Sequence, residues 1–202
     1  MLPQPSLLGW LPVWQRNFLV WRKLALPSIL GNLADPLIYM LGLGYGLGAM
    51  LPTIEGQPYI AFLAGGTVCA STMNAATFEA LYSAFSRMHV QKTWEAILNT
   101  PLGLGDVVAG ELFWAATKSL LSGAAILVVI TAMGLTNGPL MLWALPAIVL
   151  TGLAFAALGA LVRPLLAGQV PADALIHIMA LLATAAVAFT VALHLTRRRL
   201  LK

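Results

Sequence analysis

Charged residues are scarce in this chain of 202 residues. Asp, Glu, Lys and Arg together make up 9% of it, against 60% hydrophobic residues and a mean hydropathy of +0.88. Soluble globular domains carry roughly 25% charged residues, so the composition excludes a soluble protein. It predicts an integral membrane protein instead.

Cysteine and catalytic motifs are nearly absent as well. The single cysteine, Cys69, excludes an intramolecular disulfide, and its apolar surroundings indicate a small packing residue. The sequence has no HExxH, no GxSxG and no glycine-rich phosphate loop. Asp173 and His177 lie one helical turn apart, but two ligands without a third indicate a structural or interfacial histidine rather than a metal site. We therefore expect no catalytic, metal or cofactor site here, and any ATP must be bound by a partner.

Long apolar runs take up most of the sequence. A helix needs roughly 20 mostly apolar residues to cross the hydrocarbon layer. Five segments reach that length, at about residues 27–50, 58–82, 108–133, 139–162 and 172–195. The sequence therefore predicts an all-α fold, a polytopic bundle of membrane helices over residues 27–202, with no room for a soluble catalytic domain.

Basic residues are missing from two connections between these runs, those near Glu55 and Asn137. The net charge of +4 would suggest nucleic acid as the partner of a soluble protein, but here the basic residues gather at the ends of the runs, where they mark cytoplasmic loops. Those before the first run and between the second and third are Arg16, Arg22, Lys23, Arg87 and Lys92. We therefore expect no nucleic-acid partner, and a cytoplasmic N-terminus and 87–107 loop.

Residues 1–26 lack the pattern of a cleaved signal peptide, because their short apolar stretch is interrupted by prolines and followed by charge. Aromatic residues recur there at spacings of four, four and three, at Trp10, Trp14, Phe18 and Trp21. This spacing predicts one face of an amphipathic helix. We expect an interfacial helix whose tryptophan rings lie at headgroup depth among membrane lipids. A frayed tail with chance aromatics is the alternative.

Glycines alternate near the end of the first run, at Gly42, Gly44, Gly46 and Gly48. Small residues four apart let two helices approach closely in lipid. Gly42 with Gly46, and Gly44 with Gly48, therefore predict helix contacts, either inside the subunit or between the two subunits of a dimer.

Few ionisable residues lie within the runs, and each raises a functional question because charge is costly in lipid. They are Asp35, Glu79, Glu111 and Lys118. Glu111 and Lys118 are seven residues apart on one face of the third run, where they could line a polar pathway. Alternatively, all four lie near the cytoplasmic ends of their runs, where long side chains reach the interface.

Four motifs resemble a known family. They are PLIYMLGLGYGLG at 36–48, YIAFLAGG at 59–66, TFEALYSAFSRM at 77–88 and, most specific, TWEAILNTPLGLGDVVAGELFWAATKS at 93–119. The chain resembles the membrane subunits of ABC-2 type exporters, and among them the NodJ-like permeases associated with lipo-oligosaccharide export. The resemblance extends to about residue 162 and resumes at RPLLAGQ, residues 163–169.

The resemblance implies a multi-pass permease of the bacterial inner membrane, which forms a homodimer and works with a separate cytoplasmic ABC ATPase subunit. Its cargo would be an amphiphilic lipid-linked or acylated saccharide. In such exporters a short helix between the second and third spans inserts into a groove on the ATPase. The matching positions here are about 89–100. The apolar contact would come from Trp94, Ile97 and Leu98, with Lys92 and Glu95 at its rim. A helix lying on the membrane surface without a partner is the alternative.

One departure from the family follows the fourth run. The family has a fifth span and an apolar outer segment before the last span, whereas here Val162 runs directly into Arg163. Five crossings from a cytoplasmic N-terminus place the basic tail at 197–202 outside, against the charge rule, so we expect a mixed topology. An internal deletion, an inactive truncated permease, an edited sequence and a non-transporting scaffold all fit a missing span.

Overall fold

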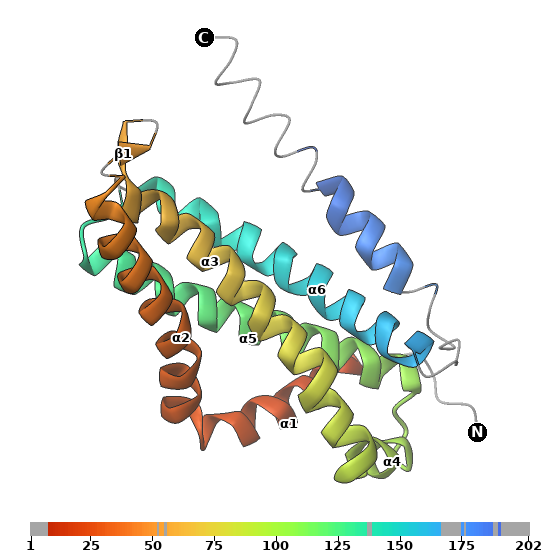
Figure 1. Ribbon diagram of the computed structural model, residues 1–202. Helices are drawn as coiled ribbons and strands as arrows, with labels where there is room; N and C mark the ends of the chain where they lie inside the picture. Colours follow the sequence, from red (N-terminus) through yellow and green to blue (C-terminus); the bar gives the residue numbers. More distant parts are fainter. Residues whose placement is uncertain are drawn as a thin grey trace.

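Helices make up nearly all of the described chain in this computed structural model (Figure 1). The structure describes residues 8–51, 53–54, 56–136, 139–166, 175, 177–187 and 190. The α-helices are α1 (Trp10–Arg22), α2 (Ala25–Gly46), α3 (Tyr59–Phe78), α4 (Thr93–Leu98), α5 (Leu104–Ala132) and α6 (Ala144–Leu166). The shorter elements are η1 (Leu47–Ala49), β1 (Thr53–Ile54), β2 (Gln57–Pro58), η2 (Glu79–Ser83), η3 (Ser86–Val90) and η4 (Pro139–Trp143). The strands β1 and β2 form an antiparallel pair.

Three helices of the described chain are long and apolar enough to cross a membrane. They cover Ala25–Ala49, Leu104–Ala132 and Met141–Ala160. The predicted all-α membrane bundle with a separate N-terminal helix is thereby confirmed. The 58–82 run forms α3 and most of η2 and is not among these three helices, and α3 carries the polar residues Thr67, Ser71, Thr72 and Asn74. The expected 172–195 span is described only in part, as the shorter apolar helix His177–Val187. Asp173, the arginines at 197–199 and Lys202 lie outside the described residues.

The helix α5 lies at the centre of the bundle, packed against α1, α3 and α6, while α2 covers α3 (Figure 1). Small residues let these helices approach closely. Gly152 of α6 meets Ser119 of α5, and Ser71 of α3 shares a hydrogen bond of 2.8 Å with Ser122 of α5. The apolar core between them consists of Met40, Ala64, Val68, Ile126, Leu127, Ile130 and Ile148.

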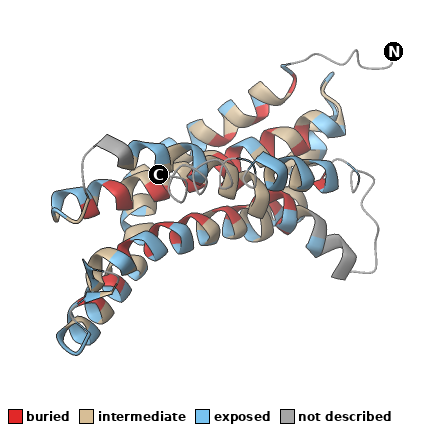
Figure 2. Cartoon of the chain, turned by 90° about the horizontal axis from the view of Figure 1, so that it is seen from above, coloured by how far each residue is buried: buried red, intermediate tan, exposed pale blue. Residues whose placement is uncertain are grey.

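Exposed residues lie along the outer faces of the helices (Figure 2), and many of them are large and apolar. Ile38 of α2 is 70% exposed and Val128 of α5 is 68% exposed. Water would oppose such exposure on so many residues, whereas lipid tails accept it. The outer surface therefore suits a hydrocarbon environment.

The two ends of the bundle differ in charge. The turn around β1 and the connection from α5 to α6 lie at one end, and they are the connections without basic residues (Figure 1). The helices α1 and α4 lie at the opposite end with the first turn of α5, together with Arg16, Arg87 and Lys92. These three basic residues thus gather at one end of the bundle, and the side of the membrane on which that end lies stays a prediction.

Candidate functional site at the charged end of the bundle

The short helix α4 follows a reversal of the chain at Lys92. Lys92 has a φ of 52°, the left-handed conformation, and no other non-glycine residue in the described ranges has a positive φ. The helix covers Thr93–Leu98, which is shorter than the expected 89–100, because residues 86–90 form the wide turn η3. After the turn at Pro101, Asp106 accepts a hydrogen bond of 3.0 Å from the Gly103 N–H and starts α5.

The residues of α4 face two directions. Trp94 and Ile97 are half-buried, and the Trp94 indole donates a hydrogen bond of 3.3 Å to Glu111 of α5. Lys92 and Glu95 pair at 3.2 Å on the exposed side. Leu98 is 41% exposed there. The structure therefore turns Trp94 toward its own bundle and leaves Leu98 as the large exposed apolar residue of α4.

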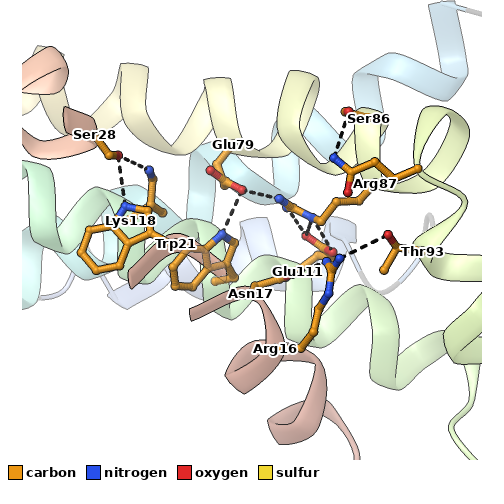
Figure 3. Close-up of polar contacts among 12 residues, drawn as sticks. Arg16, Asn17, Trp21, Ser28, Glu79, Ser86, Arg87, Thr93, Glu111 and Lys118 are labelled. Carbon is orange, nitrogen blue, oxygen red and sulfur yellow. Dashed lines mark hydrogen bonds and ion pairs between the residues drawn. The ribbon is translucent and has the colours of Figure 1, made fainter. Parts of the chain in front are cut away.

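A buried ion cluster consists of Glu79, Arg87 and Glu111 (Figure 3), and Trp94 of α4 contacts it through Glu111. Nη1 of Arg87 lies 2.8 Å from Oε1 of Glu79, and its Nε donates to the Glu111 carboxylate at 3.0 Å and 3.1 Å. The Arg87 Nη2 also pairs with Glu111. The three side chains are between 6% and 11% exposed. An arginine fork held by two carboxylates fixes geometry as well as charge.

A wide helical turn makes the Glu79 to Arg87 contact possible. In a regular α-helix, residues eight apart differ by about 80° in direction, whereas residues seven apart share a face. The Ala84 N–H bonds to the Glu79 carbonyl five residues back, so η2 holds one extra residue. Arg87 thereby takes the direction that residue 86 would have in a regular helix.

Two indole groups complete the cluster. Trp114, only 2% exposed, donates to Glu79 at 2.9 Å. Trp94 donates to Glu111 at 3.3 Å. Each carboxylate thus accepts from the arginine and from one tryptophan. A buried charge with this many partners is stable, but removing one partner leaves an uncompensated charge.

Arg16 of α1 is a second cation beside the cluster. It donates to Asn17 at 3.0 Å and to Thr93 of α4 at 3.3 Å (Figure 3). Burial and the nearby Arg87 lower the pKa of Arg16, while Glu111 opposes them. Burial also acts to lower the pKa of Arg87, but its hydrogen bond and attraction to Glu111, and then Glu79, outweigh it and raise that pKa. Both guanidinium groups stay charged.

The aromatic face of α1 packs against α5. The rings of Trp10 and Phe113 lie 4.5 Å apart, and Trp14 donates a hydrogen bond of 2.9 Å to Thr117. The rings of Phe18 and Trp21 lie 6.5 Å and 6.1 Å from that of Trp114. The rings therefore contact protein, and the exposed apolar residues of α1 are Leu19 and Val20. The headgroup depth of the tryptophans stays a prediction.

Glu111 and Lys118 have different partners, although they share one face of α5. Glu111 belongs to the ion cluster, whereas Lys118 donates to Ser28 of α2 at 2.9 Å and lies 5.7 Å from the Trp21 ring. A cavity of about 10 Å³ beside Lys118 has room for about one water molecule. The polar pathway that we expected from the two residues stays a prediction.

The alternating glycines of α2 and η1 have two environments. A Cβ at Gly44 would lie 2.8 Å from Ile60 of α3, and one at Gly48 would lie 3.8 Å from Tyr59. At Gly42 and Gly46 nothing lies within 4 Å. An open hollow of about 470 Å³ is lined by Asp35, Ile38, Tyr39, Gly42 and Leu43. One glycine pair thus packs inside the subunit, and the other is open.

Sequence reasoning missed the ion cluster. It singled out Glu79 and Glu111 because they lie within apolar runs, but it took Arg87 only as a marker of orientation. An unpaired charge is costly near lipid. The presence of an arginine close in sequence to two glutamates within apolar runs was therefore the signal that could have predicted an ion pair. In the described part of the chain, no three His, Cys, Asp or Glu side chains gather as a metal site.

Comparisons with known proteins identify relatives at the sequence level only. No family model and no solved structure matches the chain. It is 56% identical over 157 residues to nodulation protein J of Rhizobium meliloti strain 1021, covering 78% of this chain and 60% of that protein. It is 57% identical over 164 residues to nodulation protein J of Rhizobium leguminosarum bv. trifolii, covering 81% of this chain and 62% of that protein. It is 35% identical over 159 residues to nodulation protein J of Azorhizobium caulinodans, covering 79% of this chain and 63% of that protein.

The chain spans about three fifths of the length of these relatives, all of which are named nodulation protein J. The aligned residues make up about four fifths of the chain. Identity above 50% over more than 150 residues indicates common descent rather than shared composition. Over this aligned part, the chain is homologous to the nodulation protein J sequences.

Proposed function

We propose that this chain is the membrane permease subunit of an ATP-driven exporter. The supporting observation is the arrangement of α4. Leu98, Lys92 and Glu95 are exposed on the surface of the chain, while Trp94 is hydrogen-bonded to α5. An exposed apolar residue between charges suits a compact protein contact. A helix bonded to a membrane-spanning helix also suits the transfer of movement from a cytoplasmic ATPase to the bundle.

The ATP would be bound by the partner subunit, because the sequence has no phosphate-binding motif. The cargo would be amphiphilic, a lipid-linked or acylated saccharide leaving the cytoplasm across the inner membrane. This cargo class rests on the resemblance to lipo-oligosaccharide exporters. The name of the relatives, nodulation protein J, is compatible with it.

The open face of α2 suits a second copy of the chain. Gly42 and Gly46 lie four residues apart with no neighbour within 4 Å, which is the small-residue spacing that pairs membrane helices. Ile38 and Tyr39 beside them are 70% and 64% exposed. A homodimer across this face would enclose a pathway between the two subunits, and ATP-driven movement would open it alternately to each side.

Copurification in mild detergent tests the proposal. We expect the wild-type chain to retain a protein that hydrolyses ATP. Leu98→Ala should weaken that association by about 2 kcal/mol, roughly thirtyfold, because it removes the large exposed apolar residue of α4. Leu142→Ala is the matched control, since Leu142 is 55% exposed but lies in η4 at the other end of the bundle. A wild-type chain that retains no ATPase would favour a scaffold or an inactive truncated permease.

A further inference from the structure

We propose that Arg87 is a positioning residue, which holds α4 in the pose that the ATPase contact requires without touching the partner. The inference rests on the proposed function for the use of α4, but its geometric part concerns this chain alone. Arg87 lies in η3, outside α4, and its side chain is 11% exposed. It can therefore influence a docking surface only through the groups that it holds.

Two side-chain hydrogen bonds join α4 to other helices. Trp94 donates to Glu111 of α5 at 3.3 Å, and Thr93 accepts from Arg16 of α1 at 3.3 Å. Glu111 is the acceptor for Trp94 and for Arg87 together. One of the two bonds that hold α4 thus depends on the orientation of the Glu111 carboxylate, and Arg87 fixes that orientation.

Loss of Arg87 would leave two buried carboxylates, Glu79 and Glu111, without the cation that lies between them. Each would then be drawn toward water, because an uncompensated buried charge is costly. Trp114 would still hold Glu79 through its indole N–H. Glu111 would keep only the bond from Trp94, which is longer than the bond from Trp114 to Glu79. The contact between α4 and α5 would therefore loosen first.

The same cluster connects α4 with several membrane helices. Glu79 continues from α3, Glu111 and Trp114 belong to α5, and Arg16 joins α1 to Thr93. A displacement of α4 would therefore act on α1, α3 and α5 together. If the cluster served only global stability, loss of Arg87 would loosen all helices alike rather than α4 first. This difference makes the proposal testable.

Amide hydrogen exchange of the purified chain in detergent tests the geometric part without any ATPase. Arg87→Gln should speed exchange at residues 93–98 by about tenfold or more, while exchange in the middle of α5 and α6 stays close to wild type. Arg87→Lys should give an intermediate rate, because it keeps the charge but loses the fork. Arg22→Gln is the matched control, since Arg22 is exposed at the same end of the bundle.

Equal acceleration across α4, α5 and α6 would overturn the proposal and make Arg87 a purely structural residue. Unchanged exchange at 93–98 would overturn it as well. A second measurement compares ATPase retention by the Arg87→Gln and Arg22→Gln variants. If the wild-type chain retains no ATPase, the proposed function fails, while local loosening of α4 would still establish the positioning role.

Discussion

At the scale of single residues, Gly42 and Gly44 are two positions apart in α2 but meet different surroundings. A side chain at Gly44 would collide with Ile60, whereas the space beside Gly42 is open within the subunit. The sequence did not decide whether each glycine pair packs inside the subunit or against a second subunit. Only the rotation of α2 about its axis, which depends on packing with α3, assigns each pair to its face.

We expect Gly44→Leu to destabilise the subunit by about 1–3 kcal/mol, because the added side chain overpacks the contact with Ile60. Gly42→Leu should leave the unfolding temperature unchanged and weaken the proposed dimer. Thermal unfolding in detergent measures the first effect, and chemical cross-linking of membranes measures the second. A Gly42→Leu variant that cross-links like wild type would exclude this face from the dimer.

Trp114 provides a second test at this scale. Trp114→Phe keeps the ring but removes the N–H that donates to Glu79, so it should cost about 1–3 kcal/mol of stability. Trp143→Phe should cost little, because Trp143 is 77% exposed. Denaturation in mixed detergents compares the two variants, and similar losses would show that the Glu79 bond contributes nothing.

At the scale of elements, α1 owes its position to a close crossing with α5. A Cβ at Gly110 would lie 2.6 Å from Cβ of Val13 and 2.9 Å from the carbonyl oxygen of Trp10. The contact with backbone cannot be relieved by a change of rotamer. The aromatic spacing correctly predicted a helix here, but the same stripe suits a headgroup layer or a neighbouring helix, so the sequence could not choose the surface that it covers.

Gly110→Val should therefore displace α1 and destabilise the chain by about 1–3 kcal/mol. Gly105→Val in the first turn of α5 is the control, because nothing lies within 4 Å of that position. Limited proteolysis after Arg22 or Lys23 reports the displacement. Equal protection of the two variants from cleavage would show that the crossing tolerates a larger residue.

At the scale of the whole molecule, apolar runs and basic residues predicted most of the architecture. The runs at 27–50, 108–133 and 139–162 correspond to the three helices in the described ranges that are long and apolar enough to span a membrane, since length and hydropathy suffice to define such a helix. The ion cluster could not be predicted in the same way. It depends on an extra residue in a helical turn and on side chains 35 and 24 residues apart, such as Trp114 with Glu79 and Arg87 with Glu111.

The orientation of the bundle gives a further prediction. In a Cys69→Ala background, a cysteine at Gln57 should react with an impermeant thiol reagent added to intact cells. A cysteine at Gln91 should react only after the cells are opened. Both glutamines are exposed, so a difference in labelling reports the side of the membrane rather than burial. Labelling of Gln91→Cys from outside would reverse the orientation.

The wide turn η2 also affects how the chain can change in length. In a regular helix, an insertion or deletion of one residue rotates all following residues by about 100° about the helix axis. The extra residue in Glu79–Ser83 is already absorbed by a bond that reaches five residues back. A chain shortened by one residue there can close to a regular turn and still present Arg87 to Glu79. In this segment a residue can thus be gained or lost without disturbing the helices on either side.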